Sequence, residues 1–169
     1  MRILATLLLA SVCFGANEHS NRRAPGFSLP DSSSRRYDLQ DFRGKWVLLD
    51  FMLTNCPHCK ALSEKLEEAK KKFAGRVVIV SVVVAPPETQ VTVKNYVQAN
   101  KITVPILFDQ GQVAASYFDA TPTRPSFDTP HLFVIDPGGR IVRDWGHVEG
   151  PNDFLASPAF MKELAGLVK

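Results

Sequence analysis

Cysteine is scarce in this chain of 169 residues, which has three, at positions 13, 56 and 59. So few cysteines exclude a small secreted fold held together by several disulfides. One CxxC supplies two of the four ligands that a structural zinc site usually needs, and no second pair exists. Haem attachment needs a histidine directly after the second cysteine, and position 60 is Lys60. We therefore expect neither a metal nor a cofactor.

Charge of one sign is also lacking, because the formal net charge is only +3. This small excess does not indicate a nucleic-acid partner, and the basic pairs Arg22-Arg23 and Arg35-Arg36 are most simply solvated surface. The chain has no internal repeat and no low-complexity run. Its length suits a single domain with a substantial core.

Long apolar runs are missing after the first residues, where Ile3 to Val12 follows Met1-Arg2. This run is too short to span a bilayer and is typical of a signal peptide. We expect a signal peptide over 1–15, a flexible segment over 16–23 and one domain over 24–169. The protein would then be secreted or periplasmic. Membrane attachment is expected only if the first segment is retained or Cys13 carries a lipid.

The remaining sequence alternates between strand and helix patterns. Turn residues after Leu29 indicate an N-terminal β-hairpin, and the apolar run before Asn55 indicates a central strand. The order predicts an α/β fold in which a central mixed sheet has helices on both faces. The expected strands are 46–52, 77–84, 104–108, 131–136 and 140–145; the expected helices are 56–73, 89–100, 112–117 and 158–168; 120–130 is expected to be loop.

The pair in Cys56-Pro57-His58-Cys59 falls where the central strand passes into a helix. A disulfide across so short a loop adds little stability, so a redox role is favoured over a structural one. Asn55 is a natural N-cap, and Pro57 is tolerated in the first turn. The positive end of the helix and a protonated His58 would favour the Cys56 thiolate, while Cys59 would resolve mixed disulfides.

Two further positions bear on this chemistry. Asp50 is a lone acid in an apolar strand, so its pKa should be raised, and it would exchange a proton with Cys59 through water. The alternative is that Asp50 lies at an exposed strand end. Pro130 would lie beside the cysteines if its peptide bond were cis. His131, which follows it, is most simply a half-exposed strand residue.

These residues resemble the thioredoxin-like superfamily, in particular the TlpA/ResA-type thiol-disulfide oxidoreductases of the redoxin and AhpC/TSA group. The resemblance covers roughly 24–145 and rests on four stretches. It implies a thioredoxin-like fold, catalytic Cys56 and Cys59, a cis peptide between Thr129 and Pro130, and protein dithiols or disulfides as partners, with a redox donor or acceptor protein. The stretches are Ala24 to Leu29 with Leu39 to Phe51, Cys56 to Cys59, Val104 to Asp109, and Pro130 to Ile141.

Some features depart from this family. About six extra residues, around Thr121 to Asp128, precede the proposed cis-proline. The Pro-His dipeptide is that of strongly oxidising DsbA-type enzymes, whereas TlpA/ResA-type proteins usually act as reductants, so the direction of electron flow stays open.

Two alternative functions also stay open. One is a peroxiredoxin-like peroxidase, although Thr54 lies one residue too close to Cys56. The other is a Sco-like copper carrier using both cysteines and a histidine such as His131 or His147.

Overall fold

The computed structural model describes residues 18–123, 126–150 and 153–168. The expected signal peptide and residues 16 and 17 lie outside this range. Within it, no helix has the length and apolar character needed to cross a membrane. The elements are β1 (Arg22–Arg23), β2 (Ser28–Pro30), β3 (Arg36–Asp38), the 3-10 helix η1 (Leu39–Phe42), β4 (Trp46–Phe51), α1 (Pro57–Lys72), β5 (Val77–Val84), α2 (Gln90–Asn100), β6 (Ile106–Asp109), α3 (Gln112–Tyr117), β7 (His131–Ile135), β8 (Arg140–Gly146) and α4 (Ala159–Leu167).

The main sheet is mixed, as expected, with the strand order β1-β8-β7-β4-β5-β6. The β4–β5 and β5–β6 pairs are parallel, whereas β4–β7, β7–β8 and β1–β8 are antiparallel. The expected N-terminal hairpin forms a separate sheet of β2 and β3. Because β4 lies in the middle and is covered on both faces, it consists almost wholly of apolar residues.

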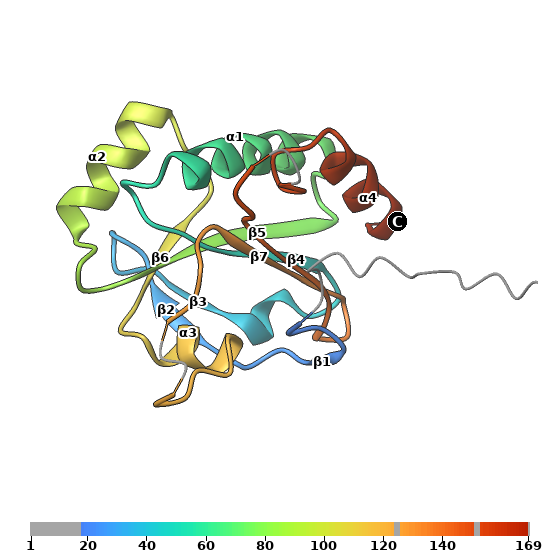
Figure 1. Ribbon diagram of the computed structural model, residues 1–169, viewed down its shortest axis with the longest axis horizontal. Coiled ribbons are helices and arrows are strands. Elements are labelled where there is room, and N and C mark those ends of the chain that lie inside the picture. Colours follow the sequence, from blue (N-terminus) through green and yellow to red (C-terminus); the bar gives the residue numbers. More distant parts are fainter. Residues whose placement is uncertain (1–17, 124–125, 151–152, 169) are drawn as a thin grey trace, which may run out of the picture.

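Helices cover both faces of the sheet, with α1, α2 and α4 on one side and α3 with η1 and the hairpin on the other (Figure 1). Side chains of β4 alternate between the two cores. Leu48 and Met52 contact the α1 core, while Val47 and Phe51 contact the other. Burying each large apolar side chain contributes roughly 1.5–3 kcal/mol. This alternation directs Asp50 toward the α1 core.

The helix α1 buries Leu62, Leu66 and Ala69 along one stripe, which is the spacing that predicted it. Its start differs from the prediction: the N-cap is Cys56, not Asn55. Cys56 has the extended backbone of an N-cap, and its sulfur accepts the Cys59 N–H at 3.2 Å. The first turn is therefore capped by a thiol that also belongs to the candidate redox pair.

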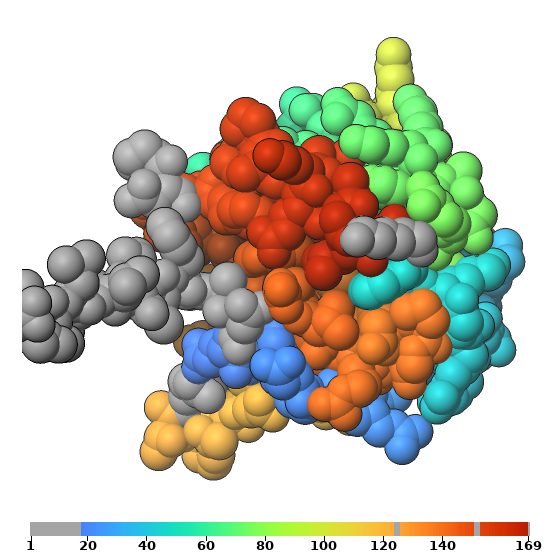
Figure 2. Space-filling model, turned by 90° about the vertical axis from the view of Figure 1, so that its right-hand side faces the viewer, coloured from blue at the N-terminus to red at the C-terminus, as the bar shows by residue number. Residues whose placement is uncertain are grey.

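The described part of the segment before the expected domain, residues 18–23, packs against β8. Arg22 pairs with Ile141 in β8, and the Asn21 N–H donates to the same residue's carbonyl at 2.9 Å. His19 is buried. The backbone groups of β8 thereby gain partners at what would otherwise be a bare sheet edge. In Figure 2 this segment (blue) lies against the β7–β8 region (orange), below the C-terminal residues (red).

Candidate active site

The two cysteines differ sharply in exposure. Cys59 has no exposed surface, whereas Cys56 is partly exposed, and both thiols are unpaired in the structure. The Leu53 N–H points at the Cys59 sulfur at 3.5 Å. Burial, the hydrogen bond to Cys56 and the nearby charges of Cys56 and Asp50 raise the pKa of the Cys59 thiol. Cys56 is therefore the sulfur that a partner can reach, and Cys59 is held protonated behind it.

Asp50 is fully buried, so the alternative of an exposed strand end is wrong. The Ser81 hydroxyl donates to its Oδ2 at 3.1 Å, and Oδ1 has no hydrogen-bond partner among the described residues. Burial raises the pKa of Asp50 to about 7, although the Ser81 hydrogen bond lowers it somewhat. The carboxyl group lies on the α1 side of β4, as Cys59 does, and its charge contributes to the raised pKa of Cys59.

The Thr129–Pro130 peptide bond is cis, as the sequence pattern predicted. The Thr129 carbonyl oxygen lies 4.0 Å from the Cys56 sulfur, so this turn forms one wall of the site. Part of the insertion packs into the fold, because the Phe127 ring stacks on Phe118 with centroids 4.3 Å apart. Two cis bonds, at Pro86 and Pro87, were not predicted.

His131 is buried rather than half-exposed. Its Nε2 lies 3.2 Å from Asp144 Oδ2, and its ring lies against Gly146, where an added Cβ would come within 3.0 Å. Burial alone would raise the pKa of Asp144, but hydrogen bonds from His131, Ser20 and the His19 N–H lower it. His131 therefore belongs to a structural network beside the cis-proline turn.

Glu88 holds the loop that leads to Cys56, a role that the sequence analysis missed. Its carboxylate accepts the Thr54 N–H at 2.7 Å and the Thr54 hydroxyl at 2.9 Å. The Thr92 hydroxyl donates to the same group at 2.6 Å. In the sequence, Glu88 stands between Pro86-Pro87 and the start of α2, which is an unusual place for a carboxylate. Its partner Thr54 is distant in the chain, so no local pattern relates the two residues. The Thr54 hydroxyl, which lies one residue too close to Cys56 for the peroxidase pattern, donates its hydrogen to Glu88.

His58 and His147 come together at the mouth of the site. Their rings stack with centroids 3.8 Å apart at 26°. The His147 N–H donates to the Pro130 carbonyl at 3.0 Å, which ties it to the cis-proline turn. Its Nδ1 lies 2.8 Å from Oδ2 of Asp153, a buried residue that the sequence analysis did not single out.

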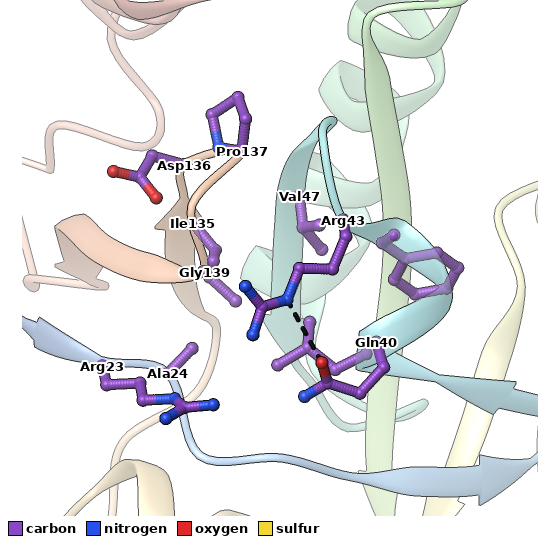
Figure 3. A pocket seen from close by; sticks show the side chains of 11 residues that line it. Arg23, Ala24, Gln40, Arg43, Val47, Ile135, Asp136, Pro137 and Gly139 are labelled. Atoms are coloured by element: carbon purple, nitrogen blue, oxygen red, sulfur yellow. Dashed lines mark hydrogen bonds between the residues drawn. The ribbon is translucent and has the colours of Figure 1, made fainter.

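A hollow of about 250 Å³ opens beside this turn, with walls from His131, Asp144, His147, Phe127 and Asp128 among others. A second pocket lies at the other end of β4, next to Val47 (Figure 3). It measures about 20 Å³, room for about one water, and its Arg43 Nε donates to Gln40 Oε1 at 3.2 Å. The cysteine-bearing end thus has the larger recess of the two.

The match to known families agrees with this geometry. The family model described as "AhpC/TSA family" matches residues 21–144. The chain belongs to the AhpC/TSA family. Within this family it is similar to "Thioredoxin-like protein YneN" of Bacillus subtilis (strain 168), with 33% identity over 124 residues, which is 73% of this chain and 68% of the relative.

This AhpC/TSA chain is also similar to "Thiol-disulfide oxidoreductase ResA" of Bacillus subtilis (strain 168), with 31% identity over 121 residues, or 71% of the chain. The match spans 63% of that relative's length, less than two thirds. The thioredoxin domain of a thiol-disulfide oxidoreductase from Bacteroides vulgatus superposes with a TM-score of 0.68 at 21% identity, covering 89% of this chain and 98% of that one. The fold is therefore thioredoxin-like, as predicted.

Proposed function

We propose that this protein is a thiol-disulfide oxidoreductase that acts outside the cytoplasm on dithiols or disulfides of partner proteins. The observation that carries the proposal is the asymmetry of the pair. Cys56 is reachable and accepts an N–H at the start of α1, and Cys59 is buried with its backbone nitrogen 3.2 Å from the Cys56 sulfur. The names of the relatives support the same chemistry.

In the reducing direction, the Cys56 thiolate attacks one sulfur of a partner's disulfide. The partner's sulfur–sulfur bond breaks, its second sulfur leaves as a thiolate, and a mixed disulfide forms. Cys59 then loses its proton and attacks the Cys56 sulfur, which releases the partner with two thiols after protonation. The pair has become a disulfide and two electrons have passed to the partner. The oxidising direction is the same sequence in reverse.

The second step needs a base for the buried Cys59 thiol. Asp50 suits this role because its pKa of about 7 leaves it partly ionised near neutral pH, and it faces the same core. The Thr129–Pro130 turn supplies the wall against which a partner's backbone would lie next to Cys56. His58 and Pro57 complete the exposed rim and set the environment of the Cys56 sulfur.

The expected domain, 24–169, is extended by this proposal to include the packed segment from residue 18. A signal peptide over 1–15 would carry the chain across a membrane, and retention or a lipid on Cys13 would hold it there. The partners are then proteins with accessible cysteines and a donor or acceptor that resets the pair.

Replacing Cys59 with Ser tests the proposal. The variant should accumulate mixed disulfides with a dithiol or disulfide protein substrate, visible as slower bands on non-reducing gels that vanish with dithiothreitol. Cys56→Ser is the matched control, in which no adduct should form. If the unmodified protein neither reduces nor oxidises a protein substrate and Cys59→Ser traps nothing, the proposed function is wrong.

The reduction potential of the pair then gives the direction of flow. A value near about −270 mV, as in thioredoxin, indicates a donor, and one near about −120 mV, as in DsbA, indicates an oxidant.

A further inference from the structure

We propose that His58, His147 and Asp153 form a binding site for a divalent transition-metal ion of borderline softness, for which Zn²⁺ is the probe. One nitrogen of each imidazole and one carboxylate oxygen of Asp153 lie within 4.8 Å of one another. This site uses neither cysteine, so it does not depend on the proposed redox function. Two imidazoles and a carboxylate are ligands that suit Zn²⁺, with a fourth position left for water.

The side chains of His147 and Asp153 are already held in position without an ion. His147 follows β8, and its backbone N–H is held by the Pro130 carbonyl at 3.0 Å. Asp153 is buried, and its Oδ1 accepts the Leu155 N–H at 3.1 Å, which leaves Oδ2 facing His147 at 2.8 Å. A site that needs little rearrangement loses little free energy in ordering its ligands.

A second observation also indicates a ligand at His147: one of its ring nitrogens is buried without a hydrogen bond to any described residue. The side chain is 10% exposed, and its Nε2 is buried without a hydrogen-bond partner among the described residues. The carboxylate of Glu149, which is 89% exposed, lies 3.5 Å away and makes no hydrogen bond to it. On binding, the ion would take the place of the proton between Nδ1 and the Asp153 carboxylate, while Nε2 would keep its N–H facing Glu149, the kind of outer carboxylate that orients metal-binding histidines.

His58 supplies the exposed ligand of the site. It lies in the first turn of α1, its ring stacks on that of His147 with centroids 3.8 Å apart, and one of its nitrogens lies within 4.8 Å of the other ligand atoms. The other two histidines each lie beside one carboxylate, His131 beside Asp144 at 3.2 Å and His19 beside Asp119 at 3.4 Å. Among the described residues neither belongs to a group of three possible ligands, as His147 does.

Zn²⁺ titration of a tag-free chain with Cys13, Cys56 and Cys59 replaced by Ser tests the site without any thiol ligand. Serine is itself a good N-cap, so the change at position 56 preserves the start of α1. Isothermal titration should show one Zn²⁺ per chain. In this background His58→Ala and His147→Ala should each remove the binding, and Asp153→Asn, which removes the carboxylate ligand, should weaken it by more than the roughly 10- to 100-fold that loss of an outer-shell partner costs.

Asp119→Asn is the matched control, because it alters a histidine–carboxylate pair outside the cluster and should leave the affinity unchanged. Circular dichroism of each variant verifies folding, and His58→Ala, at an exposed position, keeps the test decisive if Asp153→Asn fails to fold. Absence of Zn²⁺ binding, or binding that survives the loss of both His58 and His147, overturns the proposal.

Discussion

Asp50→Asn should make the protein more stable, and the gain should depend on pH in a defined way. The group has a pKa of about 7 in the folded chain, against an ordinary value of 3.8. An acid whose folded pKa is raised keeps its proton where the unfolded chain has lost it. The free energy of unfolding therefore falls as the pH rises from about 4 to about 7 and is constant above that range with respect to this group.

The magnitude follows from the interval between the two pKa values. At 1.36 kcal/mol per pH unit, the raised pKa costs about 4 kcal/mol of stability at pH 8 relative to pH 4. Small domains are stable by only about 5–15 kcal/mol, so this is a large fraction. Asparagine keeps the shape, and its carbonyl can accept the Ser81 hydrogen bond, but it has no charge to desolvate. The variant should therefore lack this pH-dependent loss.

Urea unfolding of the reduced protein at pH 4, 5, 6, 7 and 8 measures the effect. The quantity to plot is the stability of Asp50→Asn minus that of the unmodified chain, because pH effects of other groups cancel in the difference. Any fixed cost of burying the amide shifts this curve without changing its slope. Ser81→Ala removes the hydrogen bond that lowers the pKa of Asp50, so in that background the rise should extend to higher pH.

A difference that stays level across this range would refute the reasoning, since it would mean that Asp50 has the same pKa in the folded and unfolded chains. A difference that falls with pH would mean that the folded protein stabilises the carboxylate. In either case Asp50 would not be the base that receives a proton from Cys59.

Two further predictions concern the groups around the site. The hydrogen bonds of Asp144 hold its pKa below the usual range. Its contribution to stability is therefore present above about pH 4 and is lost as the pH falls. The difference in free energy of unfolding between Asp144→Asn and the unmodified chain, measured with urea, should become smaller at low pH. Glu88→Ala leaves the Thr54 N–H without its partner, which should lower the free energy of unfolding by about 1–3 kcal/mol. It should also slow thiol-disulfide exchange, measured as insulin reduction. An unchanged exchange rate would show that the loop needs no such support.

Much of the fold could be predicted because the chain has strong local patterns. The β-branched run of β5 and the apolar stripe of α1 indicate their elements without any tertiary information. Each of these two patterns lies within a short sequence range over which the relevant residues act together. The cis bond before Pro130 was expected on another ground, the resemblance to the thioredoxin-like family.

The missed features depend on residues that are distant in the chain. The Glu88–Thr54 contact and the pairing of β1 with β8 join segments that no local pattern relates. The buried state of His131 depends in the same way on Asp144 in the neighbouring strand. Capping by Cys56 instead of Asn55 was missed for another reason. Asparagine is a preferred N-cap residue and a cysteine sulfur is only a weak hydrogen-bond acceptor, so residue type alone favours Asn55. The backbone geometry shows that the Cys56 sulfur accepts the Cys59 N–H.

The direction of electron flow depends mainly on Cys56, because the raised pKa keeps Cys59 neutral in the reduced pair. A stabilised Cys56 thiolate favours the dithiol form and so makes the disulfide a stronger oxidant. The Cys59 N–H at 3.2 Å acts in that sense, while the Thr129 carbonyl at 4.0 Å presents a partial negative charge that opposes it. A metal ion bound by His58, His147 and Asp153 would supply positive charge at the same rim and so favour the Cys56 thiolate. In the proposed function, the groups at the rim of the site therefore act on the Cys56 sulfur directly, whereas the buried Asp50 acts on the pair through Cys59.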